Sequence, residues 1–170
     1  RVDEMTETQA FLRWSPSTDN VKVKKYEIYC DGKQVGTTSK TSYNYKKLLP
    51  GKSYEFYIRA VDTSGLRSPR SPSLRASTKK DLEAPTIPQN LRISAVKKSS
   101  VSLSWNASTD NVKVKGYIIY CNGSAVATAT RKSRSVKKPS GFGAGIYWIR
   151  AFDQSGNLSG NSNTVTVVAL

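Results

Sequence analysis

The sequence predicts an all-β protein made of two copies of one small domain. An internal repeat indicates the copies: Trp14–Gly32 returns as Trp105–Gly123 at an offset of 91 residues, with 14 of 19 positions identical. Apolar residues also alternate with polar ones over short runs that turn residues separate. Period two with one apolar face is typical of half-buried strands. Short strands at this spacing favour a sandwich or a barrel for each copy.

The expected strands can be followed along both copies by their apolar faces. In the first copy these faces are Ala10, Leu12 and Trp14, then Tyr26, Ile28 and Cys30, then Tyr54, Phe56, Ile58 and Ala60. In the second copy they include Val101, Leu103 and Trp105, and the copy closes with Val165 and Val167. Turns are expected between them at Asp31-Gly32, Pro50-Gly51, Ser64-Gly65, Asn122-Gly123 and Ser155-Gly156.

Composition excludes several kinds of chemistry. The 170 residues contain no histidine, so a Ser-His-Asp triad, a Cys-His pair and a His-bearing zinc site are all ruled out. Two cysteines are too few for a Cys₄ metal site or a disulfide framework. Lys and Arg number 27 against 12 Asp and Glu, which gives a net charge of +15. We therefore expect no catalysis, metal or cofactor in this chain.

Several motifs resemble the fibronectin type III family. They are Trp14, Tyr26–Tyr29, Leu48–Pro50, Tyr54–Ala60 and Ser64-Gly65 in the first copy, and Pro85–Leu91, Trp105, Tyr117–Tyr120 and Ala151 in the second. The motif Trp-x-x-Ser-Thr-Asp-Asn-Val resembles that of the modules in secreted bacterial chitinases and other polysaccharide-degrading enzymes. The resemblance implies two tandem immunoglobulin-like, seven-stranded β-sandwiches, each with strands A, B and E in one sheet and C′, C, F and G in the other.

The resemblance also divides the chain. Residues 1–79 are expected to form domain 1 with strand A partly truncated, residues 80–91 a Pro-containing linker with the start of strand A, and residues 92–170 domain 2. Because Arg1–Met5 aligns with Arg92–Val96, the first copy lacks the Pro-x-x-Pro-x-x-Leu lead, and we expect a piece of a longer polypeptide.

Tyr54 matches the family's tyrosine corner, in which the phenol bonds back to the backbone across the E–F turn. The second copy has Pro139, Gly141 and Gly145 at the corresponding positions. We therefore expect a mobile E–F loop and lower stability in domain 2.

Two sets of reactive side chains favour structural roles. Cys30 and Cys121 are equivalent and share the inward parity of Ile28 and Ile119, so we expect buried thiols, with intermolecular bridging as the alternative. Asp19 with Asp62, and Asp110 with Asp153, fall on the B–C and F–G loops at one end of the implied fold. Turn structure is expected there, with a calcium site as the alternative.

An aromatic surface is the first binding candidate. Tyr29 and Tyr57 have outward parity on neighbouring strands, and Tyr120 and Trp148 are their counterparts, with Arg59 and Arg150 two residues further on. Such a pair can stack on the apolar face of a sugar ring. It can equally be a cross-strand pair covered by an arginine, which stabilises the sheet and binds nothing.

A cationic segment is the second candidate. Five cations fall within eight residues without an acid, on the expected edge strand E and its turn: Arg131, Lys132, Arg134, Lys137 and Lys138. Edge cations block unwanted strand pairing. They would also attract an anionic polymer such as a cell-wall polymer, whereas nucleic acid is disfavoured because no recognition motif accompanies the charge.

The resemblance thus implies a non-catalytic accessory or spacer module of a secreted or cell-surface bacterial protein. The implied parent is a polysaccharide-degrading enzyme such as a chitinase, with weak contact to a polysaccharide or cell-wall polymer. Tethered catalytic and binding domains are its expected partners, and the chain itself is expected to be monomeric. The alternatives are a structural or adhesive part of a surface protein or phage tail, and a protein-binding module that uses the B–C and F–G loops.

Overall fold

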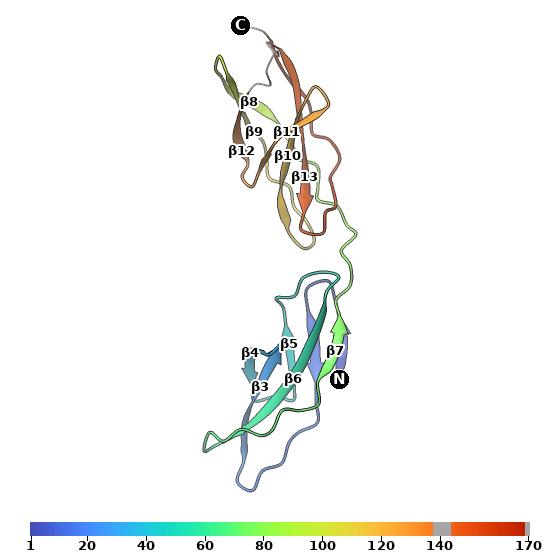
Figure 1. The fold of residues 1–170 in the computed structure, drawn as a ribbon, viewed down its shortest axis with the longest axis vertical. Helices are drawn as coiled ribbons and strands as arrows, with labels where there is room; N and C mark the ends of the chain where they lie inside the picture. Colours follow the sequence, from blue (N-terminus) through green and yellow to red (C-terminus); the bar gives the residue numbers. More distant parts are fainter. Residues whose placement is uncertain (138–143, 169–170) are drawn as a thin grey trace. The chain divides into compact units, whose positions relative to one another are not determined.

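The chain forms two compact units, Arg1–Asp81 and Leu82–Leu170, in a computed structural model that describes residues 1–137 and 144–168 (Figure 1). Throughout those ranges the secondary structure consists of strands and turns without a helix. Consequently the described residues offer no helix long and apolar enough to cross a membrane.

Unit 1 is a sandwich of two antiparallel sheets. Its strands are β1 (Val2–Met5), β2 (Ala10–Arg13), β3 (Val23–Cys30), β4 (Lys33–Thr38), β5 (Ser42–Tyr45), β6 (Ser53–Asp62) and β7 (Leu74–Ser77). One sheet has the order β1-β2-β5 and the other β4-β3-β6-β7. This is the strand order that the family resemblance implies, with A, B and E opposite C′, C, F and G.

Unit 2 repeats this topology. Its strands are β8 (Arg92–Val96), β9 (Ser100–Ser104), β10 (Val114–Cys121), β11 (Ser124–Ala129), β12 (Ser133–Lys137), β13 (Gly145–Asp153) and β14 (Val165–Val167). The two sheets have the orders β12-β9-β8 and β11-β10-β13-β14. The prediction of two all-β sandwiches is confirmed.

Tight hairpins set the register of the central strands. Asp31 and Gly32, between β3 and β4, have φ angles of 48° and 78°, and Asn122 and Gly123 have 49° and 84°. Two consecutive positive φ angles are the signature of a type I′ turn, whose twist matches that of the flanking strands. Asp31 and Asn122 also accept hydrogen bonds through Oδ1 from the backbone of β6 and β13, at 2.8 and 2.9 Å.

The apolar faces predicted from period two supply the core. Tyr26, Ile28 and Cys30 are buried in unit 1, and Tyr117, Ile119 and Cys121 are buried in unit 2. Trp14 lies edge to face against Tyr26 with 5.3 Å between ring centroids, and Trp105 lies against Tyr117 at 5.2 Å. The larger buried cluster of the described residues is that of unit 2, in which Trp105 is 2% exposed whereas Trp14 is only partly buried.

The tyrosine corner is present in unit 1. The Leu49 amide donates a hydrogen bond of 2.8 Å to the Tyr54 hydroxyl, next to the buried Leu48. In unit 2, Gly145 is the first residue of β13, whereas Pro139 and Gly141 lie outside the described residues. The expectation of a mobile loop and lower stability in unit 2 therefore stays a prediction, and the larger core of unit 2 acts in the opposite direction.

We expect Tyr54→Phe to lower the free energy of unfolding of unit 1 by about 1 kcal/mol, because it deletes one hydrogen bond and keeps the ring. Calorimetry of the full chain, which separates the transitions of the two units, checks this. Tyr57→Phe is the matched control on the same strand, since its ring stacks on Tyr29 and its hydroxyl makes no hydrogen bond to a described residue. Equal losses in both variants would contradict a stabilising corner.

Candidate functional site

The aromatic candidates meet as two cross-strand pairs. Tyr29 on β3 lies opposite Tyr57 on β6, with ring centroids 4.7 Å apart and ring planes 7° apart. Tyr120 on β10 lies opposite Trp148 on β13, with ring centroids 3.8 Å apart and ring planes 7° apart. The structure therefore brings together the residues that the sequence pairs, and all four rings are partly buried.

Other side chains cover the pair in unit 1. The Tyr29 hydroxyl donates to Glu27 Oε2 at 3.0 Å, and the Arg70 guanidinium lies 5.9 Å from the centre of the Tyr57 ring. Arg59, which the sequence places near the pair, instead donates to the Ser68 carbonyl at 3.3 Å. Each ring thus uses one face on its neighbour, and Arg70 partly covers the pair, so the area left for a sugar ring is small.

Arg150 repeats this arrangement in unit 2. Its Nε donates to the Ser159 carbonyl at 2.6 Å. Both arginines therefore hold the segment that follows β6 or β13. The sequence analysis expected them to cover the aromatic pair instead.

The sequence analysis did not predict the buried ion pair beside Tyr29, between Glu27 and Arg67. Glu27 is 1% exposed although its parity on β3 points outward. Arg67 Nε and Nη2 donate to its two carboxylate oxygens at 2.9 and 3.1 Å, and Lys25 Nζ lies 3.9 Å away. The hydrogen bond from Arg67 lowers the pKa of Glu27, more than burial raises it, and the bond from Tyr29 adds to the lowering.

The second unit has an apolar pair in the same place. At the offset of 91 residues, Ile118 takes the place of Glu27 and Leu158 that of Arg67. The backbone geometry is the same, since Arg67 bridges to Val61 and Leu158 bridges to Phe152. The same fold therefore accepts apolar residues at both positions of the ion pair, with Ile118 partly buried and Leu158 37% exposed.

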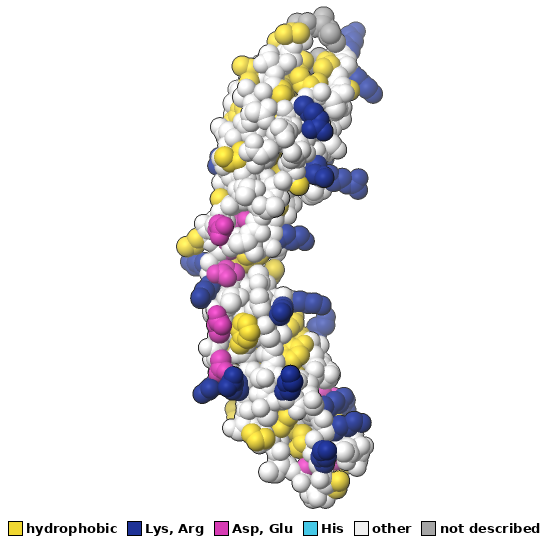
Figure 2. Space-filling view, turned by 180° about the vertical axis from the view of Figure 1, so that it is seen from behind, with side chains coloured by type: hydrophobic (Ala, Val, Ile, Leu, Met, Phe, Trp, Pro, Cys, Tyr) yellow, Lys and Arg dark blue, Asp and Glu magenta, His cyan; other side chains and the backbone are white. Residues whose placement is uncertain are grey.

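Two of the cationic candidates, Arg134 and Lys137, lie on an edge strand, whereas Arg131 and Lys132 lie in the bend just before it and not on the strand where the sequence placed them. β12 is the outermost strand of its sheet, and Arg131, Lys132, Arg134 and Lys137 are all exposed. None of these four cations has an ion pair with any of the described residues. Lys138 lies outside those ranges. On the face shown in Figure 2, Lys and Arg side chains stand out from the surface in separate groups.

The loop aspartates hold turns. Asp19 Oδ1 accepts the amides of Val21 and Lys22 at 2.9 Å each, and Asp62 Oδ1 accepts the Leu66 amide at 2.8 Å. The equivalent Asp110 and Asp153 bond in the same manner to the amides of Val112, Lys113, Gly156 and Asn157. Asp19 and Asp110 accept amides two and three residues ahead, as in Asx turns, whereas Asp62 and Asp153 accept amides three or four residues ahead. Turn structure is the role expected for all four.

Both cysteines are buried and unpaired with each other, and burial raises the pKa of the Cys30 thiol to about 11. A buried thiol of this pKa is protonated at neutral pH and is a poor nucleophile.

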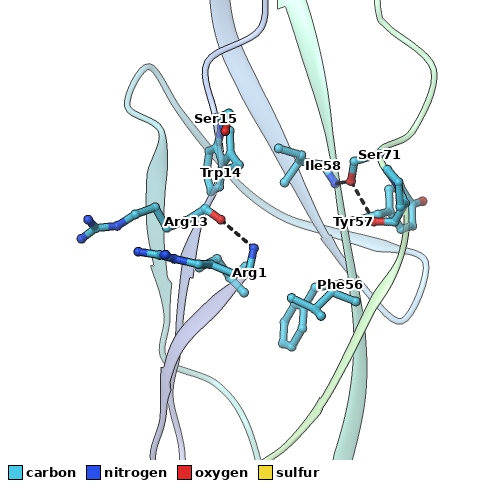
Figure 3. Close-up of a pocket in the computed structure, with 11 residues that line it drawn as sticks. Arg1, Arg13, Trp14, Ser15, Phe56, Tyr57, Ile58 and Ser71 are labelled. Carbon is cyan, nitrogen blue, oxygen red and sulfur yellow. Dashed lines mark hydrogen bonds between the residues drawn. The ribbon is translucent and has the colours of Figure 1, made fainter.

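A groove opens between the two sheets of unit 1, with a volume of about 280 Å³ (Figure 3). Arg1, Trp14 and Ser15 line it from the sheet of β2, and Phe56, Ile58 and Ser71 line it from the side of β6 and the segment after it. Figure 3 shows the α-amino group of Arg1 at its wall, where it donates to the Arg13 carbonyl at 2.8 Å. Sequence reading did not find this groove.

Comparison with known proteins matches the first unit to a known domain family. Residues 1–77 match the family model of the fibronectin type III domain. Chitinase A1 of Niallia circulans is 38% identical over 98% of this chain and 24% of its own length. Exoglucanase B of Cellulomonas fimi is 33% identical over 96% of this chain and 15% of its own, and exoglucanase A of the same organism is 37% identical over 95% and 19%. The chain spans about a quarter or less of the length of these relatives.

We expect Arg67→Leu alone to lower the unfolding free energy of unit 1 by about 2 kcal/mol at pH 7, because Glu27 then stays buried and charged with fewer donors. Glu27→Ile together with Arg67→Leu copies the pair of unit 2 and should restore most of that loss. Urea unfolding of the three chains measures the difference.

The pH dependence provides the control. Because the folded pKa of Glu27 is lowered, its ion pair contributes stability above the ordinary carboxyl pKa, and that stability is lost as the pH falls through the lower folded value. The advantage of the wild type over Arg67→Leu should therefore shrink below about pH 4. An advantage that is constant with pH would mean that Arg67 acts by packing alone.

Proposed function

Because residues 1–77 are a fibronectin type III domain and the second unit repeats its fold, we propose that the chain is a non-catalytic spacer module of an extracellular polysaccharide-degrading enzyme. One observation carries this proposal. The similarity to chitinase A1 and exoglucanase B extends over both units and the segment between them. The matching region includes both units in a chitinase and in an exoglucanase, whose names indicate different substrates. This favours a role for the two units that does not depend on the substrate.

The residues support a mechanical role rather than a catalytic one. The sequence lacks histidine, the thiols are buried, and the loop aspartates are engaged by backbone amides. A spacer acts by setting the reach of a tethered catalytic domain and so its effective concentration at the substrate.

The start of unit 2 suits such a spacer. Thr86 donates its amide to the Thr109 carbonyl at 2.9 Å and accepts the Thr109 amide at 2.9 Å. Leu91 is part of the core of unit 2, and Pro88 is fully buried. A connecting segment that packs on its own domain has less freedom than a flexible coil, and its prolines restrict it further.

Weak surface contact is the second candidate. The exposed cations on β12 and in the bend before it, with Lys138 next to them in sequence, favour an anionic cell-wall polymer over a neutral glycan. The aromatic pairs Tyr29–Tyr57 and Tyr120–Trp148 remain candidates for stacking on a sugar, although each ring already stacks on its partner.

To test the spacer role, residues 1–170 are placed between a chitinase catalytic domain and a chitin-binding domain. We expect replacement by a direct junction to lower hydrolysis of insoluble chitin several-fold and to leave hydrolysis of soluble chito-oligosaccharides unchanged, because only the solid substrate requires reach. A Gly/Ser linker of 170 residues is the control for length without stiffness. Equal rates on insoluble chitin with the direct junction would contradict the proposal.

To test surface contact, the chain is incubated with Gram-positive cell wall, chitin and cellulose at low and high salt. We expect retention on cell wall that salt abolishes and that falls when Arg131, Lys132, Arg134 and Lys137 are all changed to Ala. Changing the exposed Lys33, Lys40, Lys46 and Lys47 to Ala removes the same charge from unit 1 and is the matched control. Retention on chitin that survives salt and is lost in Trp148→Ala would instead support stacking.

A further inference from the structure

The outer face of the sheet β12-β9-β8 in unit 2 carries cations on both of its edge strands. Arg92 on β8 lies opposite Ser104, and Lys137 on β12 lies opposite Ser100. Both serines alternate along β9 with the buried Leu103, so their side chains point outward. Residues directly opposite each other in an antiparallel pair share a face, and Arg92 and Lys137 therefore belong to the outer face as well.

The hairpin between β8 and β9 adds a third cation to this face. The Lys97 amide donates to the Ser100 carbonyl at 2.8 Å, so Lys97 stands opposite an outward-pointing residue. Lys97 and the next residue of the turn, Lys98, are both exposed. Because neighbouring strands lie about 5 Å apart, the cations of β8 and β12 face each other across β9 at about 10 Å.

The charge of these cations is not neutralised. Asp110 is the only acidic residue of the sequence between positions 84 and 137. Within the part of the chain that the structure describes, no ion pair is formed by Arg92, Lys97, Lys98 or Lys137. The surface between the two edges is therefore open, positive and free of acid.

The corresponding face of unit 1 has a different charge pattern. At the offset of 91 residues, Asp3, Glu4 and Glu7 take the place of two neutral residues and one lysine. Arg1 and Arg13 also form ion pairs with Asp3, at 2.6 and 2.8 Å. The positive face thus belongs to unit 2 and is not a consequence of the shared fold.

We propose that the outer face of β12-β9-β8 binds a linear phosphodiester polymer of the cell wall, whose phosphate groups contact Arg92, Lys97 and Lys137. Cations on both edges suit a chain that carries a charge at every repeat and lies across the sheet. Lysine is a point charge that suits phosphate, and arginine and serine hydroxyls donate to phosphate oxygens. The inference rests on the surface contact proposed above, of which it names the face and the polymer, and it is independent of the spacer role.

The face is tested with two variants of the full chain that lose the same charge from the same unit. The first removes the three cations of the outer face: Arg92→Ala, Lys97→Ala and Lys137→Ala. The second removes three exposed cations elsewhere in unit 2: Lys113→Ala, Lys115→Ala and Arg134→Ala. Arg134 is the sharpest part of this control, because it lies opposite the buried Leu103 and so belongs to the other face of the same strand as Lys137.

We expect retention on Gram-positive cell wall at low salt to fall about tenfold in the first variant and less than twofold in the second. A single negative charge gives a second comparison. Ser102→Glu places it in the middle of the face and should lower retention, whereas Thr128→Glu, at an exposed position of β11, should not. Unchanged melting temperatures show that each variant is folded.

The polymer is tested on the same cell wall after hydrofluoric acid has cleaved its phosphodiester bonds. We expect the unmodified chain to lose its retention on the treated wall. It should also bind soluble polyglycerol phosphate and not polygalacturonate, which carries carboxylates instead of phosphates.

Four results would overturn the proposal. Equal losses in the two triple variants would mean that the overall charge of unit 2 acts, so the surface contact would stand without this face. Retention on the treated wall would exclude the phosphodiester polymer as the partner. Equal binding of polygalacturonate would show that phosphate is not recognised. Absence of retention of the unmodified chain at low salt would refute the surface contact itself, and this inference with it.

Discussion

The antiparallel register between the two central strands of each unit determines the rest of the structure. Pairing Ile28 with Ile58 on β3 and β6 sends both side chains inward and sets Tyr29 against Tyr57 on the outer face. Pairing Ile119 with Ile149 does the same for Tyr120 and Trp148 on β10 and β13. A slip of one residue would exchange the two faces, exposing the core and burying the outer side chains. The type I′ turns at Asp31 and Asn122, and the hydrogen bonds that these side chains accept from β6 and β13, therefore help to fix the register of the central strands. Both faces of the sheet depend on that register.

Alternation along single strands was enough to predict which side chains this register buries. Tyr26, Ile28 and Cys30 follow from it directly, as does the strand order once the repeat and the family motifs are recognised. The burial of Glu27 could not be predicted from alternation, because its side chain points to the outer face of β3 and is covered there by Arg67, 40 residues away in the sequence. The groove does not follow either, since it depends on the distance between two sheets. The repeat itself contained a signal for the first of these: Glu27 and Arg67 both become apolar, as Ile118 and Leu158, in the second copy.

That paired change shows what the outer face of the central strands requires. A buried carboxylate needs its donors, and Arg67, Tyr29 and Lys25 all approach Glu27. An apolar pair needs none, and replacing a buried ion pair by packed apolar residues is often neutral. Two solutions on one backbone indicate that this place on the outer face does not require an ion pair. The neighbouring aromatic pair likewise needs no ligand to explain it, because a stacked cross-strand pair stabilises the sheet by itself.

The segment ahead of β8 extends the same reasoning from strands to domain boundaries. Leu91 and Pro88 are buried in unit 2, and Thr86 is bonded to Thr109 of that unit, so this part of the connection is structurally part of the domain that follows it. The exposed residues 82–84 are then the part of the connection that does not contribute to the core of unit 2. Effective concentration depends on the length and stiffness of whatever joins two domains. In a chain of such units, a connection that completes the core of the next domain couples spacing to folding, because loosening it would also cost that domain part of its core.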